Sequence, residues 1–273
     1  MPPKLGILAG GGLLPRYLIE AAQAQGRDVF VIAFRDHADA DLTHSADHKW
    51  LRLGAVGEAI EVLKAAGCVD LVMGGNIRRP SLTELRPDWR GVKFFARTGA
   101  ALLGDDGLLK AVRKELEGEG FNLLGPQDIL HSLLTPEGVL TQTAPTDEHA
   151  VDINRGIAVL NALAPVDVGQ AVAVEQGLVL GIEAIEGTAQ LILRCGALKR
   201  EGGRPVLVKL SKTEQDRQLD VPAIGPDTID QLVAAGFAGL ALEAGRSFIL
   251  GREQVIAKAN AAGLFISGVR LLA

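Results

Sequence analysis

The sequence is poor in cysteine, in aromatic residues and in positive charge. Only two of its 273 residues are cysteines, aromatic residues make up 4% of it, and its formal net charge is −5 at pH 7. A chain with this balance and no block of lysines or arginines is a poor candidate for nucleic acid binding driven by phosphate neutralisation. Cys68 and Cys195 match no metal-binding or redox spacing, so we expect two buried thiols in a reducing compartment.

Long apolar runs are also missing. No stretch approaches the roughly 18 residues that a membrane span needs. The apolar N-terminus, MPPKLGILAGGGLLP, is broken by glycines and by Pro15, so it predicts a strand and a turn and not a signal peptide. These absences leave a cytoplasmic enzyme or binding protein as the expectation.

What the chain does contain is apolar material for two domains of ordinary size, since 48% of it is hydrophobic and 33 residues are glycine. In the first half, continuous apolar segments alternate with amphipathic helical ones. This order predicts a parallel sheet covered on both faces, with right-handed crossovers, in a Rossmann-like α/β domain. The expected strands cover 4–10, 28–34, 68–75 and 121–126, and the expected helices cover 14–26, 56–67 and 103–120.

The second half has a different pattern. A helical segment at 148–163 precedes Val-rich strands, further helices and short turns, which predicts a mixed α+β domain. Between the two halves the sequence becomes polar and carries proline and glycine. We therefore expect a nucleotide-binding α/β domain at 1–134, a linker at 135–150 and a catalytic domain at 151–273.

Three glycines, Gly10, Gly11 and Gly12, follow the first expected strand and precede a helix. Glycines at this point let the backbone approach an anion, with the N–H groups of a helix pointing at it. A nucleotide contact and a merely structural tight turn both remain open. The spacing differs from G-x-G-x-x-G, and the second strand is followed by Arg35 before Asp36, which disfavours a dinucleotide-dependent oxidoreductase.

A second candidate stretch, GGNIRRPSLTELRPDW, follows the third strand of the first half. Loops that leave the carboxyl ends of parallel strands line the ligand crevice of such sheets. Gly75 and Asn76 lie at the strand end, and Arg78 and Arg79 have guanidinium groups that match pairs of phosphate oxygens. The alternative is a pair of solvated arginines.

The most polar stretch, LSKTEQDRQLDVPAIGPDT, belongs to the second half. Lys209 ends an apolar strand, and Lys212, Asp216 and Asp220 fill the loop that follows. Carboxylates on irregular backbone beside lysines are the groups that a magnesium-dependent phosphate reaction needs. An ordinary polar surface loop is the alternative.

The chain resembles the LpxI family, the UDP-2,3-diacylglucosamine pyrophosphatases of lipid A biosynthesis. Six stretches carry the resemblance in this order: AGGGLLP, GGNIRRPSLTELRPDW, LLGDDGLL, VDVGQAVAVEQGLVLGIEAIEGT, LVKLSKTEQDRQLDVPAIGPDT and GLALEAGRSFIL. The similarity covers essentially the whole chain, and several of the stretches are long and distinctive.

The resemblance implies a cytoplasmic, Mg²⁺-dependent hydrolase of Gram-negative bacteria. Such an enzyme cleaves the diphosphate of UDP-2,3-diacylglucosamine to UMP and 2,3-diacylglucosamine 1-phosphate (lipid X), with water attacking the sugar-side phosphorus. It also implies two domains with the substrate chamber between them, and the amphiphilic product suggests transient contact with the inner membrane surface. The oligomeric state stays open, with a homodimer as one alternative. The alternative function is a non-catalytic nucleotide-sugar or lipid-binding regulator.

The resemblance also implies roles for individual residues. The acidic residue that the family pattern associates with catalysis or metal falls on Asp220; Asp216 and Lys209 are further catalytic candidates, and Asp216 and Asp227 are further metal candidates. The family segment reads Glu-Gly-Thr-Asp where this chain ends in Ala189, which puts an acidic ligand there in doubt. The candidate substrate contacts are Gly10, Gly11, Gly12, Gly75, Asn76, Arg78, Arg79, Thr98, Gln170, Thr188 and Lys212.

Overall fold

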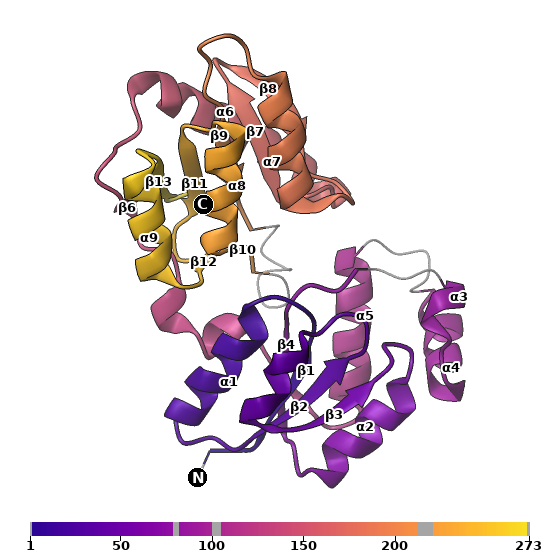
Figure 1. Ribbon diagram of the computed structural model, residues 1–273. Helices are drawn as coiled ribbons and strands as arrows, with labels where there is room; N and C mark the ends of the chain where they lie inside the picture. Colours follow the sequence, from indigo (N-terminus) through magenta and orange to yellow (C-terminus); the bar gives the residue numbers. More distant parts are fainter. Residues whose placement is uncertain (1, 79–81, 100–104, 212–220, 272–273) are drawn as a thin grey trace. The chain divides into compact units, whose positions relative to one another are not determined.

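The computed structural model describes residues 2–78, 82–99, 105–211 and 221–271, with only the backbone described at 43–45, 82–83 and 105–106. The chain divides into two compact units, unit 1 (Met1–His131) and unit 2 (Ser132–Ala273). Each unit has its own sheet and its own core (Figure 1). Residues 135–150, the expected linker, contain a short strand and the first residues of a helix that belong to unit 2.

Unit 1 is built on a parallel five-stranded sheet with strand order β3-β2-β1-β4-β5. The predicted parallel-sheet domain is therefore confirmed. Its elements are β1 (Leu5–Ala9), α1 (Leu14–Ala24), β2 (Val29–Phe34), η1 (Ala40–Ser45), β3 (Asp47–Leu51), α2 (Val56–Ala65), β4 (Asp70–Gly74), α3 (Leu82–Leu85), α4 (Trp89–Thr98), α5 (Asp105–Gly118), β5 (Asn122–Leu124) and η3 (Pro126–Asp128), with η4 (His131–Leu133) at the boundary.

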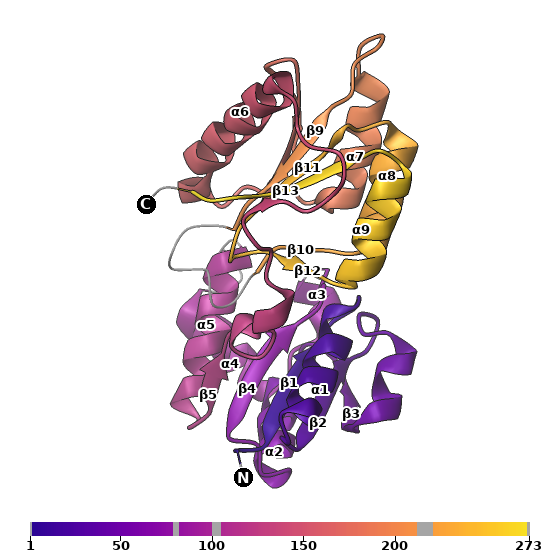
Figure 2. The ribbon, with the colours of Figure 1, turned by 90° about the vertical axis from the view of Figure 1, so that its left-hand side faces the viewer.

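The two faces of this sheet are covered by different helices, because side chains alternate between faces along each strand. On one face, Ile32 and Leu71 pack with Leu63 of α2 and Leu116 of α5. Helix α1 covers the other face and buries its own apolar side, including Leu18 (Figure 2). The sheet is thus buried on both faces, which explains why its central strands read as continuous apolar runs.

Strand β3 and helix α4 of unit 1 had no clear signal in the sequence. Strand β3, with sequence DHKWL, lies at the sheet edge and is largely exposed, so it needs few apolar residues. Helix α4 begins after Asp88, whose carboxylate accepts the Gly91 N–H (2.7 Å), and ends at Gly99 in the left-handed conformation (φ 62°). Its apolar residues Trp89 and Val92 are exposed, and only Gly91 and Phe94 of the helix are buried, so its burial leaves little pattern in the sequence.

Unit 2 is built on a mixed six-stranded sheet with strand order β6-β13-β11-β9-β7-β8. Strands β9, β11 and β13 are parallel, while β6, β7 and β8 run antiparallel to their neighbours. The predicted mixed α+β character is confirmed. Its elements are β6 (Gly138–Val139), α6 (Asp147–Leu163), η5 (Ala164–Val166), β7 (Ala171–Glu175), β8 (Leu178–Ile182), α7 (Gly187–Leu198), β9 (Val206–Lys209), β10 (Ala223–Ile224), α8 (Pro226–Ala235), β11 (Gly239–Glu243), β12 (Phe248–Ile249), α9 (Arg252–Ala261) and β13 (Phe265–Val269).

The core of unit 2 also has two sides. Val172 and Val208 face helix α6, whereas Ala173 and Leu207, their neighbours in the same strands, face α7, α8 and α9 (Figure 2). Helix α7 was not predicted from the sequence. Its residues GTAQLILRCGAL directly follow a stretch that predicts strands. The face with Leu191, Ile192 and Cys195 is identified as the buried one only by its packing against the sheet and α8.

Both cysteines are buried and free, as expected. Cys68 packs in the core of unit 1 and Cys195 in that of unit 2. Burial raises the pKa of each thiol above its ordinary value, because the thiolate would lose its hydration. Both therefore serve as small apolar side chains.

Helices α7 and α8 approach closely at Gly196, and this contact leads to a stability prediction. A Cβ at Gly196 would lie 2.7 Å from the Cβ and 2.9 Å from the carbonyl oxygen of Ala235. We expect Gly196→Ala to lower the free energy of unfolding by about 1–3 kcal/mol, because the helices must move apart. Gly118→Ala in α5 is the matched control, since a Cβ there meets no atom within 4 Å. Urea titration measures both, and an unchanged midpoint for Gly196→Ala contradicts the packing argument.

His149 should make the stability of unit 2 depend on pH. Its Nδ1 accepts the Thr146 N–H (3.1 Å), and its ring packs on Phe265 with centroids 5.1 Å apart. Burial lowers the pKa of His149 below its ordinary value, so the neutral ring is favoured in the folded state. The stabilisation is complete above the ordinary pKa of histidine, about 6.5, and is lost as the pH falls through the lower folded-state value.

We therefore expect His149→Gln to lose less stability than the parent protein when the pH is lowered from 7 to 5. Thermal unfolding at several pH values measures this difference. Equal losses for the two proteins would show that His149 does not contribute.

Candidate active site

Most of the described candidate residues lie at the carboxyl edges of the two sheets, whereas Thr98 ends α4 and Asp227 lies in the first turn of α8. In unit 1 the edge residues follow β1 and β4, and in unit 2 they lie at the end of β9 and beside it. Parallel strands bring such loops to one edge, where ligands commonly bind. A hollow lined by Lys4, Arg27, Asp28 and Asp47 lies at the opposite, amino edge of unit 1.

The charged residues at the amino edge of the unit 1 sheet have a structural role. The guanidinium of Arg27 and the carboxylate of Asp70 form a buried ion pair (2.5 Å), and Asn122 donates to the same carboxylate (2.8 Å). These contacts connect the segment before β2 with β4 and β5. We therefore place no catalytic role there.

The glycine turn after β1 is packed against the turn after β4. Gly10 N–H donates to Gly74 O (2.9 Å), and Gly11 and Asn76 exchange two backbone hydrogen bonds of 2.9 and 2.8 Å. A Cβ at Gly10 would lie 2.6 Å from the Asn76 carbonyl oxygen, and Gly75 has φ 95°. The glycines are thus required by the close approach of two backbones. The amides of Gly10 and Gly11 already have acceptors within the protein.

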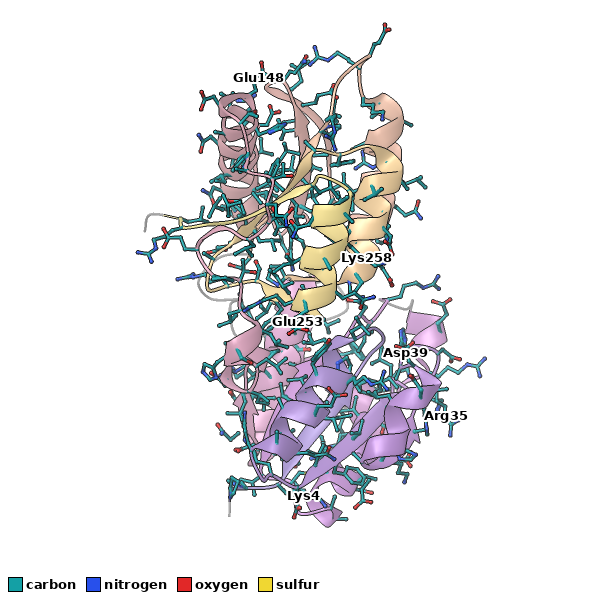
Figure 3. The ribbon with its side chains drawn as sticks, turned by 60° about the vertical axis from the view of Figure 1, so that its left-hand side comes forward. Lys4, Arg35, Asp39, Glu148, Glu253 and Lys258 are labelled. Atoms are coloured by element: carbon teal, nitrogen blue, oxygen red, sulfur yellow. The ribbon has the colours of Figure 1, made fainter. Side chains whose placement is uncertain are left out.

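Asp39 joins this turn although the sequence analysis did not single it out. Its Oδ2 accepts the Gly12 N–H at 2.9 Å, and the residue is exposed on the segment after β2, where Figure 3 labels it. An acidic residue does therefore follow the second strand, five positions beyond its end. Only the path of the chain after β2 places it against the glycine turn, so the sequence contains no local signal for it.

The remaining unit 1 candidates are spread over two segments. Asn76 and Arg78 are exposed after β4, and Arg78 lies near Glu84 (Nη2–Oε1 3.7 Å). Thr98 ends α4, and its hydroxyl donates to Phe94 O (2.7 Å). Arg79 lies outside the described residues. The structure brings Asn76 against the glycine turn, whereas Thr98 lies at the end of α4.

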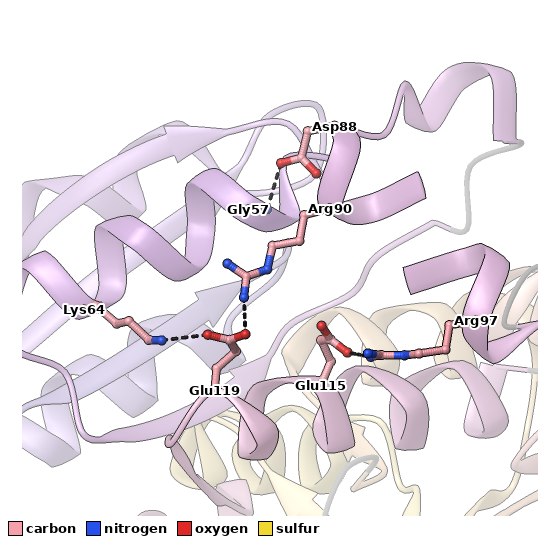
Figure 4. Close-up of polar contacts among 7 residues, drawn as sticks. All are labelled: Gly57, Lys64, Asp88, Arg90, Arg97, Glu115 and Glu119. Carbon is pink, nitrogen blue, oxygen red and sulfur yellow. Dashed lines mark hydrogen bonds and ion pairs between the residues drawn. The ribbon is translucent and has the colours of Figure 1, made fainter. Parts of the chain in front are cut away.

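Polar contacts join helix α4, which carries Thr98, to neighbouring segments of unit 1 (Figure 4). Asp88 accepts the Gly57 N–H of α2 (2.7 Å), and Arg90 pairs with Glu119, which also pairs with Lys64 (2.6 Å). The hydrogen bond from Lys64 holds the pKa of Glu119 below its ordinary value, and Arg90 adds to the effect. A second ion pair joins Arg97 to Glu115 of α5. These contacts fix the helix in a surface position where apolar packing is limited.

In unit 2, strand register places the candidates side by side. Lys209, the last residue of β9, pairs with Ala171, the first residue of β7. The carbonyl of Ala171 accepts the Glu183 N–H (2.8 Å), so the residue that follows β8 lies at the same edge. Gln170 precedes Ala171, and its carbonyl accepts the Leu210 N–H (3.0 Å).

The side chains at this edge form a continuous hydrogen-bonded series. Lys209 Nζ lies 2.6 Å from Thr188 Oγ1, and Thr188 Oγ1 lies 2.6 Å from Glu183 Oε1. Glu183 Oε2 accepts the Gln170 N–H (2.9 Å). Lys209 and Glu183 are both only 8% exposed, so each charge is buried with a polar partner. Three predicted residues thus meet here, and Glu183 joins them although the sequence analysis had not identified it.

A second buried carboxylate lies one strand away. Glu243, at the end of β11, accepts both the N–H and the hydroxyl of Ser211 (2.9 and 2.5 Å). Its other oxygen lies 3.4 Å from Arg246 Nε. Glu243 therefore fixes the backbone directly after β9, where the most polar stretch of the sequence begins.

No group of three or more His, Cys, Asp or Glu side chains within 2–78, 82–99, 105–211 and 221–271 is placed to hold a metal ion. Glu183 and Glu243 are each occupied by protein donors. Asp227 is exposed in the first turn of α8, where the helix dipole accounts for an acidic residue. A metal site would depend on Asp216 and Asp220, which, like Lys212, lie outside the described residues.

The described ranges contain no helix with the length and apolar character that crossing a bilayer requires.

Comparison with known proteins covers both units. The family model of the LpxI N-terminal domain matches residues 4–133, and that of the LpxI C-terminal domain matches residues 136–267. The chain is 38% identical over 275 residues to the UDP-2,3-diacylglucosamine pyrophosphatase LpxI of Caulobacter vibrioides, covering 97% of each protein.

Similarity to solved structures is much weaker. The Bordetella bronchiseptica enzyme WbmG, in complex with NAD and UDP, gives a TM-score of 0.29 at 19% identity over 44% of this chain and 36% of that one. The biotin carboxylase subunit of pyruvate carboxylase gives 0.27 at 13% identity over 63% and 34%. Scores this low support no argument about function. The two family matches and the relative aligned along nearly its whole length show that the chain belongs to the LpxI family.

Proposed function

We propose that the protein hydrolyses the diphosphate of UDP-2,3-diacylglucosamine to UMP and 2,3-diacylglucosamine 1-phosphate (lipid X). The observation that carries this proposal is the 38% identity to a UDP-2,3-diacylglucosamine pyrophosphatase over 97% of both chains. In the reaction, a water oxygen bonds to the sugar-side phosphorus, and the bond from that phosphorus to the bridging oxygen breaks. UMP leaves with the bridging oxygen.

Unit 1 would bind the nucleotide end of the substrate. The Gly12 N–H and the Asp39 carboxylate lie at the carboxyl edge of its sheet. A carboxylate at this position repels a phosphate but accepts hydrogen bonds from a ribose hydroxyl or a base N–H. The uridine nucleoside therefore suits the glycine turn better than the diphosphate does, and Arg78 and Arg79 after β4 are the phosphate contacts we propose for this unit.

Unit 2 would supply the catalytic groups. Lys209 brings a buried positive charge to the end of β9, and the ammonium uses one of its three donors on Thr188. A cation in a largely desolvated position stabilises the charge that develops on phosphoryl oxygens more strongly than it would in water. We propose Lys209, Asp216 and Asp220 as catalytic residues, with Gln170, Thr188 and Lys212 contacting substrate.

The proposed cofactor is Mg²⁺. Its preferred ligands are hard oxygen donors, which Asp216 and Asp220 would supply, while Asp227 stays a lesser candidate on the exposed start of α8. When bound, the ion would offset negative charge on the diphosphate and favour the ionised form of a water ligand. We also propose a cytoplasmic location and a transient contact with the inner membrane surface, because the substrate and product are amphiphilic.

The first test of this function replaces Asp220 by Ala. We expect the turnover number for UMP release to fall by about two orders of magnitude or more, because a carboxylate essential to the phosphoryl transfer is lost. The circular dichroism spectrum and melting temperature should not change. Asp230→Asn is the control, since this residue lies on α8 and pairs with Lys258 on the surface.

Near-normal UMP release by Asp220→Ala would remove Asp220 from the mechanism. Tight substrate binding by the parent protein without UMP release, with any divalent cation, would instead favour a non-catalytic binding protein.

Removal of metal should abolish activity and leave the fold intact. We expect dialysis against EDTA to stop UMP release and added Mg²⁺ to restore it. The melting temperature should change by less than about 2 °C, because the cores of both units are built from apolar side chains. Full activity after exhaustive chelation would exclude a required metal ion.

A further inference from the structure

Glu183 is a buried carboxylate that is linked through Thr188 to the candidate catalytic residue Lys209. It follows β8, is 8% exposed, and binds the Thr188 hydroxyl at 2.6 Å. Thr188 in turn binds the Lys209 ammonium at 2.6 Å. Burying a carboxylate is costly unless it is well hydrogen-bonded, so its position needs an explanation beyond packing.

The chemistry of the three groups fixes the direction of both hydrogen bonds. An ionised carboxylate can only accept, and an ammonium can only donate. The single hydroxyl hydrogen of Thr188 must therefore point at Glu183, and a lone pair of the same oxygen must face Lys209. Glu183 thus fixes the direction of the Thr188 hydroxyl hydrogen and leaves a lone pair of Oγ1 facing Lys209.

The backbone around Glu183 prevents its carboxylate from moving away. Its second oxygen accepts the Gln170 N–H (2.9 Å), and its own N–H donates to Ala171 O (2.8 Å). Gly169 packs so closely that a Cβ there would lie 2.0 Å from the Glu183 carbonyl oxygen. The carboxylate is thus held between the start of β7 and the start of α7.

We propose that Glu183 is a positioning residue for hydrolysis, which acts on Lys209 through Thr188. By taking the hydroxyl hydrogen, it holds Thr188 Oγ1 as the acceptor that directs the Lys209 ammonium at the end of β9. The remaining ammonium donors can then meet the anionic oxygens of a diphosphate. This inference rests on the proposed function, because Lys209 is assigned there to the reaction.

The test is a double-mutant cycle of Glu183→Gln and Thr188→Val, read as the turnover number for UMP release at saturating UDP-2,3-diacylglucosamine and Mg²⁺. We expect Glu183→Gln alone to lower turnover about tenfold or more, because a charged acceptor is replaced by an amide. On the Thr188→Val background the same change should have less than a twofold effect, since the group that transmits it is absent. Thr188→Ser, which keeps the hydroxyl, should retain most of the activity.

Glu186→Gln is the matched control. This carboxylate lies three residues from Glu183, pairs with Arg194 (2.7 Å) and makes no contact with Thr188 or Lys209 among the contacts of the described residues. We expect its turnover to stay within twofold of the parent. Melting temperatures of all variants separate a loss of fold from a loss of positioning.

Two outcomes would overturn the proposal. One is parent-like turnover of Glu183→Gln. The other is that Glu183→Gln lowers turnover by the same factor in the parent protein and on the Thr188→Val background. If the parent protein itself releases no UMP, the proposed function fails independently. The same cycle is then read from the dissociation constant of UDP-2,3-diacylglucosamine by calorimetry. There, a loss of affinity in Glu183→Gln that disappears on the Thr188→Val background supports the positioning role, and additive losses reject it.

Discussion

The burial of Lys209 at the end of an apolar strand is the constraint on which the unit 2 edge depends. An ammonium with so little exposure must be compensated by polar groups that the fold itself supplies. Thr188 provides the acceptor, and Glu183 orients Thr188 while carrying the opposite charge. The same groups that make the buried charge tolerable therefore also determine where it points.

At the carboxyl edge of the unit 1 sheet, the constraint is the close approach of two backbones. Two turns must pass each other at backbone distance, which only glycine allows at Gly10 and Gly75. Because the two turns are so close, the amides of Gly10 and Gly11 donate to backbone carbonyls of the protein. The Gly12 N–H is instead met by the carboxylate of Asp39, so the turn presents an acceptor beside a donor.

Much of the architecture was predictable because burial leaves periodic patterns in a sequence. Strands β1, β2 and β4 are buried on both faces and read as unbroken apolar runs, and α1 and α6 show amphipathic spacing. Edge strand β3 lacks this pattern because only one neighbour and one face constrain it. Helices α4 and α7 were missed because ion pairs position the first and contact with α8 selects the apolar face of the second.

The sequence by itself determined the parallel α/β unit and the mixed α+β unit, the turns rich in glycine, and a lysine at the end of a buried strand, because these follow from local composition and spacing. Tertiary structure decided which side chains meet. Asp39 has no motif of its own and reaches Gly12 only through the path of the chain after β2. Glu183 and Thr188 are close in sequence, but only strand register places Lys209 beside them. Local patterns record burial, whereas hydrogen bonds between distant residues depend on how the strands align.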